Sequence, residues 1–379
     1  MEPSVLLVHN RYRETGGEER LVEQLQALLR ERGVDCQLLT RDSARASRLR
    51  AGMAMLRGGL DPTSVAQAVR QHGSNIVHVH NINPLLGVHA LSTARAAGAR
   101  VVMHLHNFRL FCAIGTAFRD GQQCFSCHDR KTWPGVRFNC RGSRAESAVY
   151  AASLAWHQSA LFKNVDRFIT PSRFAKERLE ELGLPPERTD VLPNFLPTAD
   201  FAECSTAHQG SYALYVGRLA PEKGVDTAIE AATSASVPLI VAGGGPQLEH
   251  YRALAAGNKL VECIGAVDHE RLAELRAGAA FAVVPSRGPE VFPFAALESM
   301  AAGLPVLAAN VGGLPELIGT DQLLPAGAVG QWTAAMQRLW KDPGERRALG
   351  DANLDRARTQ FGADRYFERL IKFYGDLLS

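Results

Sequence analysis

The 379-residue sequence lacks the features that mark membrane, fibrous and disordered chains. No stretch approaches the roughly 18 apolar residues of a membrane span, and the start MEPSVLLVHNRYRE has no basic region followed by a long apolar one. Glycine (34) and proline (19) are too sparse for a collagen-like or low-complexity chain, and 46% of the residues are hydrophobic. We therefore expect a folded protein that resides in the cytoplasm.

Negative charge is scarce in the first half of the chain. Residues 1–200 hold 26 Lys and Arg against 19 Asp and Glu, whereas residues 201–379 hold 16 against 20. The run at 41–57, RDSARASRLRAGMAMLR, has five arginines and one aspartate. It is either a solvated loop and helix face or a contact for an acidic acceptor or the anionic inner face of a membrane. Because no aromatic residue interleaves these arginines, nucleic acid is not expected as a partner.

Short apolar runs rich in β-branched residues alternate with helical patterns. The runs are VLLV (5–8), IVHV (76–79), VVMHL (101–105), ALYVG (213–217), PLIVAG (238–243), AFAVVP (280–285) and PVLAA (305–309). EERLVEQLQALLRERG shows the helical pattern, with Leu21, Leu25, Leu28 and Leu29 on one face. Continuous apolar strands separated by helices predict parallel sheets covered on both faces, that is, an α/β fold of doubly wound layers.

A stretch rich in proline and small polar residues, 183–210, divides this pattern in two. We expect one domain over residues 1–195, with a cysteine-containing insertion at about 108–145, and a second domain over 210–360. The last segment, 361–379, is helical and could cross back to the first domain. A ligand cleft is expected between the two domains.

Two carboxylates lie eight residues apart in the segment 286–318, Glu290 in a loop after an apolar strand and Glu298 in the following helix. Pro293 suits the first turn of that helix. The helix start offers unpaired N–H groups and partial positive charge, which favour a diphosphate, and carboxylates beside it would hydrogen-bond sugar hydroxyls. The alternative is that Glu290 is an ordinary loop charge and Glu298 a surface residue.

Two further segments of the second domain follow strands. GRLAPEKG (217–224) would present Arg218 and Lys223 at the carboxyl end of a parallel strand, where they could neutralise a diphosphate. In a loop without a ligand the two would simply be solvated. VAGGGPQLE (241–249) is a glycine-rich strand-to-helix turn, in which Gly244 and Gly245 would let a nucleotide approach the backbone closely.

The first domain offers a second set of candidates. Gly16 and Gly17 lie at a helix start after the first strand, in another turn that accommodates an anion. The strand VVMHLHNFR places His104 and His106 on the same side, with His106 nearest the carboxyl end. His106 is either a packed strand residue or a side chain that points into the cleft.

Four of the seven cysteines cluster in the sequence, at Cys112, Cys124, Cys127 and Cys140. Four thiolates that include one C-x2-C pair could form a tetrahedral structural zinc site, with His128 as a substitute ligand. The alternatives are free thiols in a reducing cytoplasm or a redox pair at Cys124 and Cys127.

Taken together, these segments resemble the GT-B fold retaining glycosyltransferases of family 4 over nearly the whole chain. The resemblance is carried by GGEE, HLHNFRL, PNF, GRLAPEKG, AGGGP, the Glu290 and Glu298 pair, and GGLPE, which occur in this order. It implies two doubly wound Rossmann-like domains facing a central cleft, an amino-terminal one for the acceptor and a carboxy-terminal one for the nucleotide sugar. The implied reaction transfers a sugar from a nucleotide sugar with retained anomeric configuration.

The resemblance also implies roles for single residues. Arg218 and Lys223 would hold the diphosphate and stabilise its departing charge. Glu290 would bind hydroxyls of the donor sugar, and His106 would contact the transferring sugar, which completes the expected catalytic set. The remaining contacts to the nucleotide sugar would come from Gly16, Gly17, Gly244, Gly245, Phe292, Phe294 and Glu298, the last on the ribose.

One departure concerns the sugar. The family often has glycine at the positions of Val291 and Pro293, whereas this chain reads EVFPF. Because proline has no N–H to donate, that position cannot hydrogen-bond a sugar hydroxyl through its backbone, which leaves the donor sugar open. Cationic side chains and a helix terminus could replace a divalent metal at the diphosphate, so no cofactor is expected for catalysis.

The sequence thus predicts a glycosyltransferase with a UDP-sugar as the expected donor and a glycan, lipid-linked or small-molecule acceptor. Two alternatives keep the same fold, a nucleotide-sugar epimerase and a phosphorylase. A third, of another class, is a non-catalytic binding protein in which the cysteine module is the functional part.

Overall fold

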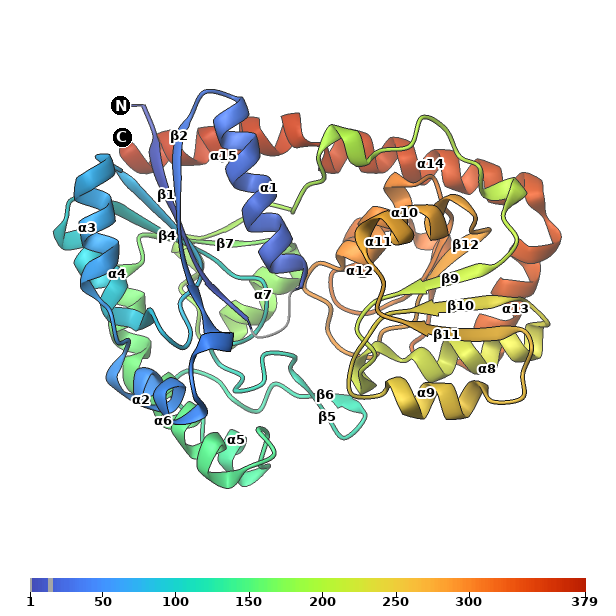
Figure 1. Ribbon diagram of the computed structural model, residues 1–379, viewed down its shortest axis with the longest axis horizontal. Helices are drawn as coiled ribbons and strands as arrows, with labels where there is room; N and C mark the ends of the chain where they lie inside the picture. Colours follow the sequence, from blue (N-terminus) through green and yellow to red (C-terminus); the bar gives the residue numbers. More distant parts are fainter. Residues whose placement is uncertain (1, 13–15) are drawn as a thin grey trace. The chain divides into compact units, whose positions relative to one another are not determined.

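The computed structural model describes residues 2–12 and 16–379, which form two compact units (Figure 1). Unit 1 contains the chain up to Ala117, then Cys124–Phe195 and Ala363–Ser379. Unit 2 contains Phe118–Gln123 and Leu196–Gly362. The last helix is therefore part of unit 1, although the chain passes through unit 2 before reaching it.

Unit 1 is built on a six-stranded parallel sheet with the order β2-β1-β3-β4-β7-β8. The strands are β1 (Ser4–Arg11), β2 (Asp35–Asp42), β3 (Ile76–Asn81), β4 (Arg100–His104), β7 (Arg167–Thr170) and β8 (Thr189–Val191). Strands β1, β3 and β4 are almost entirely buried, as the apolar runs in the sequence predict. The strand order reverses direction between β1 and β3, which makes their carboxyl ends a natural ligand position.

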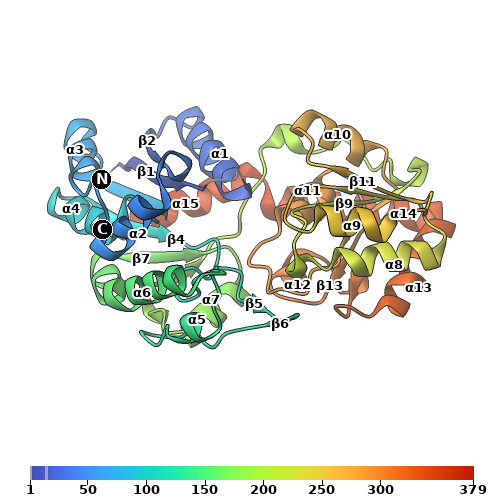
Figure 2. The ribbon, with the colours of Figure 1, turned by 60° about the horizontal axis from the view of Figure 1, so that its bottom comes forward.

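The helices of unit 1 are α1 (Gly17–Glu31), α2 (Arg48–Arg57), α3 (Thr63–His72), α4 (Gly87–Ala96), α5 (Pro134–Arg137), α6 (Arg144–Asn164), α7 (Arg173–Glu181) and α15 (Ala363–Leu378). Helix α1 contacts α15, whereas α2, α4 and α5 each contact α6 (Figure 2). The predicted apolar face of α1 is confirmed, because Leu21, Leu25, Leu28 and Leu29 are all buried. The helix ends before Gly33, whose φ of +78° reverses the chain.

Unit 2 repeats the design with the strand order β11-β10-β9-β12-β13-β14. The strands are β9 (Ala213–Val216), β10 (Leu239–Ala242), β11 (Val261–Gly265), β12 (Phe281–Val284), β13 (Val306–Ala309) and β14 (Leu323–Leu324). In chain order this is the 3-2-1-4-5-6 arrangement of the Rossmann fold, whose reversal lies between β9 and β12. A short antiparallel hairpin, β5 (Phe118–Arg119) and β6 (Gln122–Gln123), also clusters with this unit.

Helices cover both faces of the second sheet. They are α8 (Val225–Ala235), α9 (Leu248–Ala255), α10 (His269–Ala277), α11 (Phe294–Ala301), α12 (Leu314–Leu317), α13 (Val329–Lys341) and α14 (Pro343–Phe361). Successive residues of β9 belong to different cores: Tyr215 packs in the cluster that contains Trp332 of α13, and Leu214 in the one that contains Met300 of α11. This alternation confirms the predicted doubly wound α/β architecture.

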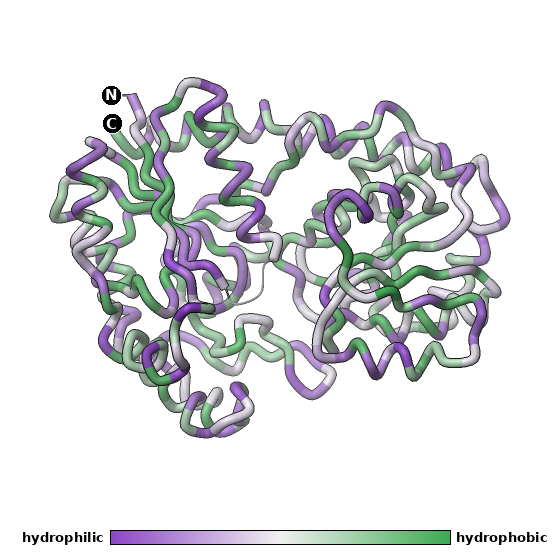
Figure 3. The backbone as a smooth tube through the Cα atoms, viewed as in Figure 1, coloured by the Kyte–Doolittle hydropathy of each residue, from purple (hydrophilic) through white to green (hydrophobic). Residues whose placement is uncertain are grey.

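Hydropathy follows the same arrangement. The strands of each sheet are mainly hydrophobic, and hydrophilic residues concentrate in the loops and on the outer helical turns (Figure 3). Among the residues that the structure describes, no helix combines the length and apolar character needed to cross a membrane.

Candidate functional site

Two loops of unit 2 are joined at the point where its strand order reverses. One follows β9 and carries Arg218 and Lys223, and the other follows β12 and carries Glu290. The carbonyl of Glu222 accepts hydrogen bonds from the backbone N–H groups of Arg287 (2.8 Å) and Gly288 (2.9 Å). Because these bonds tie one loop to the other, side chains that are 67 positions apart in sequence meet.

Gly224 makes the close approach of the two loops possible. Its φ is +64°, and a Cβ atom there would lie 2.1 Å from the carbonyl oxygen of Pro285. No residue with a side chain fits such a contact. The glycine that ends GRLAPEKG therefore has a structural task, which the sequence pattern alone does not show.

Lys223 and Glu290 form the centre of the arrangement. The Lys223 Nζ donates to Oε1 of Glu290 at 2.6 Å, and the Ser286 hydroxyl donates to the same oxygen at 2.5 Å. The side chains of Lys223 and Glu290 are 27% and 13% exposed, so the pair is partly shielded from water yet reachable by a ligand. One ammonium and one carboxylate are thus held at the carboxyl ends of β9 and β12.

Arg218 lies beside this pair and is held by two contacts. Its guanidinium forms an ion pair with Glu222, and its carbonyl accepts a hydrogen bond from the Tyr215 hydroxyl at 3.0 Å. Burial, and after it the charge of Glu290, raises the pKa of Tyr215 well above its usual range, so this hydroxyl stays a neutral donor. The Arg218 side chain is 46% exposed, which leaves part of its donor fork open to an anion.

Glu298 is held separately, in α11. It forms an ion pair with Arg276 at the end of α10, and both side chains are largely buried (14% and 6% exposed). The guanidinium fixes the direction of the carboxylate. Sequence reasoning missed Arg276, because it lies 22 residues upstream in an ordinary charged helix and no motif marks it.

The glycine-rich turn after β10 packs against the Arg218 loop. A Cβ atom on Gly243 would lie 1.8 Å from the carbonyl oxygen of Gly217, and one on Gly245 would lie 2.5 Å from that of Leu219. The backbone N–H of Leu219 donates to the carbonyl of Gly244 at 2.7 Å. Gly243 and Gly245 are thus required by backbone packing, whereas a Cβ atom on Gly244 would meet only the Ala266 methyl group, at 3.5 Å.

The start of α11 differs slightly from expectation. The helix begins at Phe294, so Pro293 occupies the N-cap position and not the first turn, and no side chain caps the helix. Phe292 and Phe294 contact each other edge to face with ring centres 5.8 Å apart, and Phe292 also contacts Phe361. Phe292 is thereby fixed in the core of unit 2 at least in part.

In unit 1, His106 belongs to a cluster of histidines at the carboxyl ends of β3 and β4. Its ring stacks on that of His104, with centres 4.2 Å apart, and its Nε2 lies 2.9 Å from Nδ1 of His80. His78 stacks on His80 and pairs with the hydroxyl of Tyr374 in α15, at 2.6 Å. Sequence reasoning singled out HLHN but not IVHVHN, although both place histidines at a period of two.

Burial lowers the pKa of all four of these histidines. The pKa of His78 and of His106 falls to about 3, and the pKa values of His80 and His104 fall well below their usual range. Desolvation is the main cause, and the neighbouring imidazoles add to it for His80, His104 and His106. The cluster is therefore neutral at physiological pH, and His106 can accept or donate a hydrogen bond without charge.

Three of these histidines are also candidate metal ligands. Ligand nitrogens of His78, His80 and His104 lie within 4.8 Å of one another, and no other group of three such side chains is found in residues 2–12 and 16–379. His78 Nε2, His80 Nε2 and both nitrogens of His104 are buried and have no hydrogen-bond partner in that part of the chain. Neutral imidazole is a ligand type that zinc accepts.

The glycines of GGEE lie at the start of α1. The N–H of Gly16 donates to Oε2 of Glu19 at 2.9 Å, and Gly17 is the first residue of the helix. Glu18 is buried next to Glu19, and burial followed by the charge of Glu19 raises the pKa of Glu18 to about 8. An additional ionisable group with a pKa near neutrality therefore lies beside the expected anion turn.

The four clustered cysteines lie near one another in unit 1, and none of the seven cysteines forms a disulfide. Burial raises the pKa of Cys127 to about 11, and the other three cysteines of the cluster add to this shift. Within the described residues, no three of these sulfur atoms come within 4.8 Å of one another. Zinc binding by this set would require the sulfurs to draw closer together.

The structure thus collects the candidates in two places. Arg218, Lys223 and Glu290 gather in unit 2 around the paired loops, and Glu298 is oriented there by Arg276. His106, Gly16 and Gly17 belong to unit 1.

Comparison with known proteins places each half of the chain in a glycosyltransferase family. The family described as Glycosyltransferase Family 4 matches residues 15–200, and the family described as Glycosyl transferases group 1 matches residues 199–356. Among similar proteins, the D-inositol 3-phosphate glycosyltransferase of Acidothermus cellulolyticus is 32% identical over 244 residues, which are 56% of this chain and 54% of that protein. The glycogen synthase of Mycobacterium tuberculosis is 33% identical over 207 residues, 50% of this chain and 50% of that one. The chain spans about half the length of these relatives.

Solved structures show the same fold at low sequence identity. Sucrose-phosphate synthase from Thermosynechococcus elongatus superposes with a TM-score of 0.74 at 18% identity, covering 100% of this chain and 99% of that one. HepE of Anabaena, solved with UDP, gives a TM-score of 0.67 at 16% identity, covering 99% and 100%. With two parallel six-stranded α/β sheets and these matches along its length, the chain belongs to the GT-B glycosyltransferases of group 1 and family 4.

Proposed function

We propose that this protein transfers a sugar from a UDP-sugar to a hydroxyl group of an acceptor, with retention of the anomeric configuration. The observation that carries the proposal is the joined pair of loops in unit 2, which holds Arg218, Lys223 and Glu290 at the carboxyl ends of β9 and β12. This is where Rossmann-like sheets bind nucleotides. HepE, which shares the fold, has been solved with UDP and with UDP-glucose, which supports the choice of nucleotide.

Lys223 and Arg218 are suited to a diphosphate because each has only one carboxylate partner in the contacts described above. In the proposal, Lys223 donates to an oxygen of one phosphate while keeping its bond to Glu290, and the exposed side of the Arg218 guanidinium binds the second phosphate. Glu290 then accepts hydrogen bonds from hydroxyls of the sugar, and Glu298, oriented by Arg276, from those of the ribose.

The same proposal assigns the remaining contacts. Gly244 leaves room for the nucleotide at the backbone, and the Phe292 and Phe294 segment borders the uncapped start of α11. Gly16 and Gly17 line the diphosphate side in unit 1, and the neutral imidazole of His106 contacts the transferring sugar. Gly245 contributes through packing on Leu219 more than through space for a ligand.

The transfer step balances without a further reactant. The bond between the anomeric carbon and the diphosphate oxygen breaks, and a bond between that carbon and the acceptor oxygen forms on the same face. The acceptor proton passes to the departing phosphate oxygen, and UDP leaves with the bonding electron pair. Arg218 and Lys223 lower the barrier because they stabilise the charge that develops on the diphosphate.

The cysteine cluster and the arginine run also belong to the proposed function. We propose a structural zinc ion at Cys112, Cys124, Cys127 and Cys140, which would bind as the four sulfurs draw together. The influence of the other three thiols on the pKa of Cys127 and the loop-rich segment around them support this proposal. The transfer step itself is routed through protein cations. Seven cysteines that form no disulfide suit a reducing cytoplasm, and the arginine run at 41–57 suits peripheral contact with an anionic membrane.

A thermal-shift panel of UDP, GDP, ADP and dTDP tests the nucleotide. We expect the largest stabilisation with UDP, since a ligand that binds only the folded state raises its stability. Lys223→Met should weaken UDP binding about 10- to 100-fold, as expected for a hydrogen bond to a charged group. Lys259→Met, at an exposed lysine of the same unit, is the matched control. No thermal shift with any of the four nucleotides, or equal UDP affinity in the two variants, would refute the proposal.

A further inference from the structure

Unit 1 contains a groove lined by residues of α2 and α6. These two helices lie side by side (Figures 1 and 2). Its volume is about 710 Å³, within the range of small-molecule sites. Its lining includes Tyr12, Asn83 and Arg109 from loops that follow strands, and residues of α2 and α6 that are mostly apolar. The groove thus combines charged or polar groups with apolar side chains.

Part of the polar lining comes from the carboxyl edge of the unit 1 sheet. Tyr12 follows β1 and Asn83 follows β3, the two strands between which the strand order reverses. The Arg109 guanidinium lies over the ring of Tyr12, 4.9 Å from its centre, and its buried Nε has no hydrogen-bond partner in the described part of the chain. A guanidinium with one unused, buried donor therefore belongs to the lining of the groove.

The charge of the groove favours an anion. Arg48, Arg109 and Arg141 line it together with one carboxylate, Glu146. Arg48 and Arg141 both lie near Glu146, but at 3.7 and 3.9 Å, so neither makes a close ion pair with it. Three guanidiniums against one carboxylate leave an excess of positive charge for a phosphate or similar group.

The apolar wall is exposed to an extent that is unusual for a folded protein. On α2, Leu49 is 75% exposed and Met53 and Leu56 are each 40% exposed, and all three line the groove. Among the described residues, five of the six large exposed apolar side chains lie on or next to α2, α5 and α6, the other two being Trp133 and Trp156. Exposed apolar patches of this kind mark binding surfaces.

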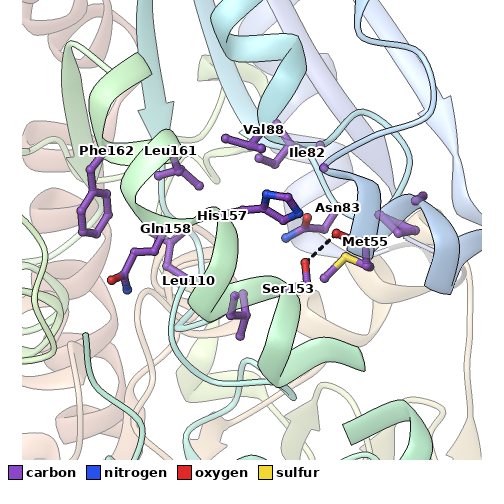
Figure 4. A pocket seen from close by; sticks show the side chains of 15 residues that line it. Met55, Ile82, Asn83, Val88, Leu110, Ser153, His157, Gln158, Leu161 and Phe162 are labelled. Atoms are coloured by element: carbon purple, nitrogen blue, oxygen red, sulfur yellow. Dashed lines mark hydrogen bonds between the residues drawn. The ribbon is translucent and has the colours of Figure 1, made fainter. Parts of the chain in front are cut away.

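A second, smaller cavity adjoins the groove (Figure 4). It shares Met55, Asn83 and Pro84 with the groove and extends along α6 as far as Phe162. Its volume is about 40 Å³, and its lining is mainly apolar, with the Ser153 hydroxyl engaged by the carbonyl of Met55 at 2.8 Å. The two cavities therefore share one wall, formed by Met55, Asn83 and Pro84.

We propose that this groove binds an amphiphilic acceptor, a single molecule with an anionic phosphate-bearing headgroup and a hydrocarbon chain. Arg109 and Arg48 hold the headgroup, and the chain covers Leu49, Met53 and Leu56. The proposal rests on the proposed function and names its acceptor class. It accounts for two features together, the excess of arginine and the exposed apolar wall, which a soluble glycan would leave without a role.

Isothermal titration of the full chain with dodecyl phosphate, kept below micelle-forming concentration, tests the proposal. We expect it to bind at least tenfold more tightly than inorganic phosphate, which lacks the chain, and than dodecyl maltoside, which lacks the charge. Arg48→Gln and Leu56→Ser should each weaken binding several-fold. Their matched controls, Arg45→Gln and Leu254→Ser, alter residues of similar exposure (88% against 83%, and 41% against 40%) outside the groove and should leave it unchanged.

Each outcome decides between explanations. Equal binding of inorganic phosphate would indicate a simple anion site, and equal binding of dodecyl maltoside an unspecific apolar surface; either overturns the proposal. Sedimentation with phosphatidylcholine vesicles containing phosphatidylglycerol separates the groove from adsorption of the whole face. If Arg45→Gln and Arg48→Gln reduce vesicle binding equally and the protein does not bind dodecyl phosphate, the arginines serve membrane adsorption and the groove proposal is overturned. A UDP-induced thermal shift is measured in the same preparation. If UDP still stabilises the protein while dodecyl phosphate does not bind, the acceptor proposal is refuted and the proposed function is not.

Discussion

Substitution by alanine should have different effects on the free energy of unfolding at the neighbouring positions Gly244 and Gly245. Gly245 has a φ of +144°, and an added Cβ atom would lie 2.5 Å from the carbonyl oxygen and 2.8 Å from the nitrogen of Leu219. An added Cβ atom on Gly244 would meet only the Ala266 methyl group, at the ordinary distance of 3.5 Å. The pair therefore separates backbone packing from space for a ligand.

The expected loss at Gly245 has two sources. Holding alanine in this backbone region costs about 1–3 kcal/mol, and the overlap with Leu219 costs about 1–3 kcal/mol more. Gly245→Ala should thus lower the free energy of unfolding by roughly 2–6 kcal/mol and the melting temperature by about 4–24 °C for a unit of this size. Gly244→Ala should be neutral, or stabilising by about 0.4–1 kcal/mol, because alanine reduces the freedom of the unfolded chain.

Calorimetric melting and UDP titration of both variants check the reasoning. If the nucleotide approaches the backbone at Gly244, the stable Gly244→Ala variant should still lose UDP affinity, about tenfold or more. Gly245→Ala should lose affinity as well, because the displaced Leu219 is next to Arg218. A Gly245→Ala protein as stable as Gly244→Ala would refute the packing account, and unchanged UDP affinity in Gly244→Ala would remove that glycine from the site.

Three further predictions concern unit 1. Tyr374→Phe should lower the free energy of unfolding by about 1–3 kcal/mol in urea titrations, because it leaves His78 Nδ1 buried without its partner. The control Tyr366→Phe, on the same helix, should leave the free energy of unfolding unchanged, since that buried hydroxyl has no hydrogen-bond partner in the described residues. Equal losses in the two variants would contradict the role of the Tyr374 bond. The pKa of Glu18 is raised from 4.5 to about 8, so the folded state keeps a proton that the unfolded chain releases. This group therefore makes the free energy of unfolding fall as pH rises between those values, by up to about 1.4 kcal/mol per pH unit. Glu18→Gln should flatten this pH dependence in urea titrations, and an unchanged slope would argue against the raised pKa. Elemental analysis of the purified protein should find zinc that disappears in the Cys112→Ser, Cys140→Ser double variant and persists in Cys204→Ser, at an exposed cysteine; zinc that survives the double variant would point to the histidines instead.

The sequence predicted the fold well because continuous apolar runs reveal buried parallel strands. VLLV, IVHV and AFAVVP each became a central strand, and the apolar stripe of α1 is buried as expected. The family resemblance also follows from local motifs, since strand-to-helix turns such as GRLAPEKG and AGGGP are contiguous in the chain. Contacts between neighbours in sequence are the ones that a sequence pattern can record.

The chain alone therefore determined two doubly wound α/β sheets, the position of Arg218, Lys223 and Glu290 after strands, and the family. Only the tertiary structure decided that Lys223 meets Glu290 across 67 residues, that Arg276 orients Glu298, and that His78, His80, His104 and His106 form one neutral cluster. It also showed that Gly243 and Gly245 serve backbone packing and that α2 and α6 enclose a groove. The physical reason is that strand order and helix packing bring distant segments together, and no local pattern of residues encodes which distant side chain will be the partner.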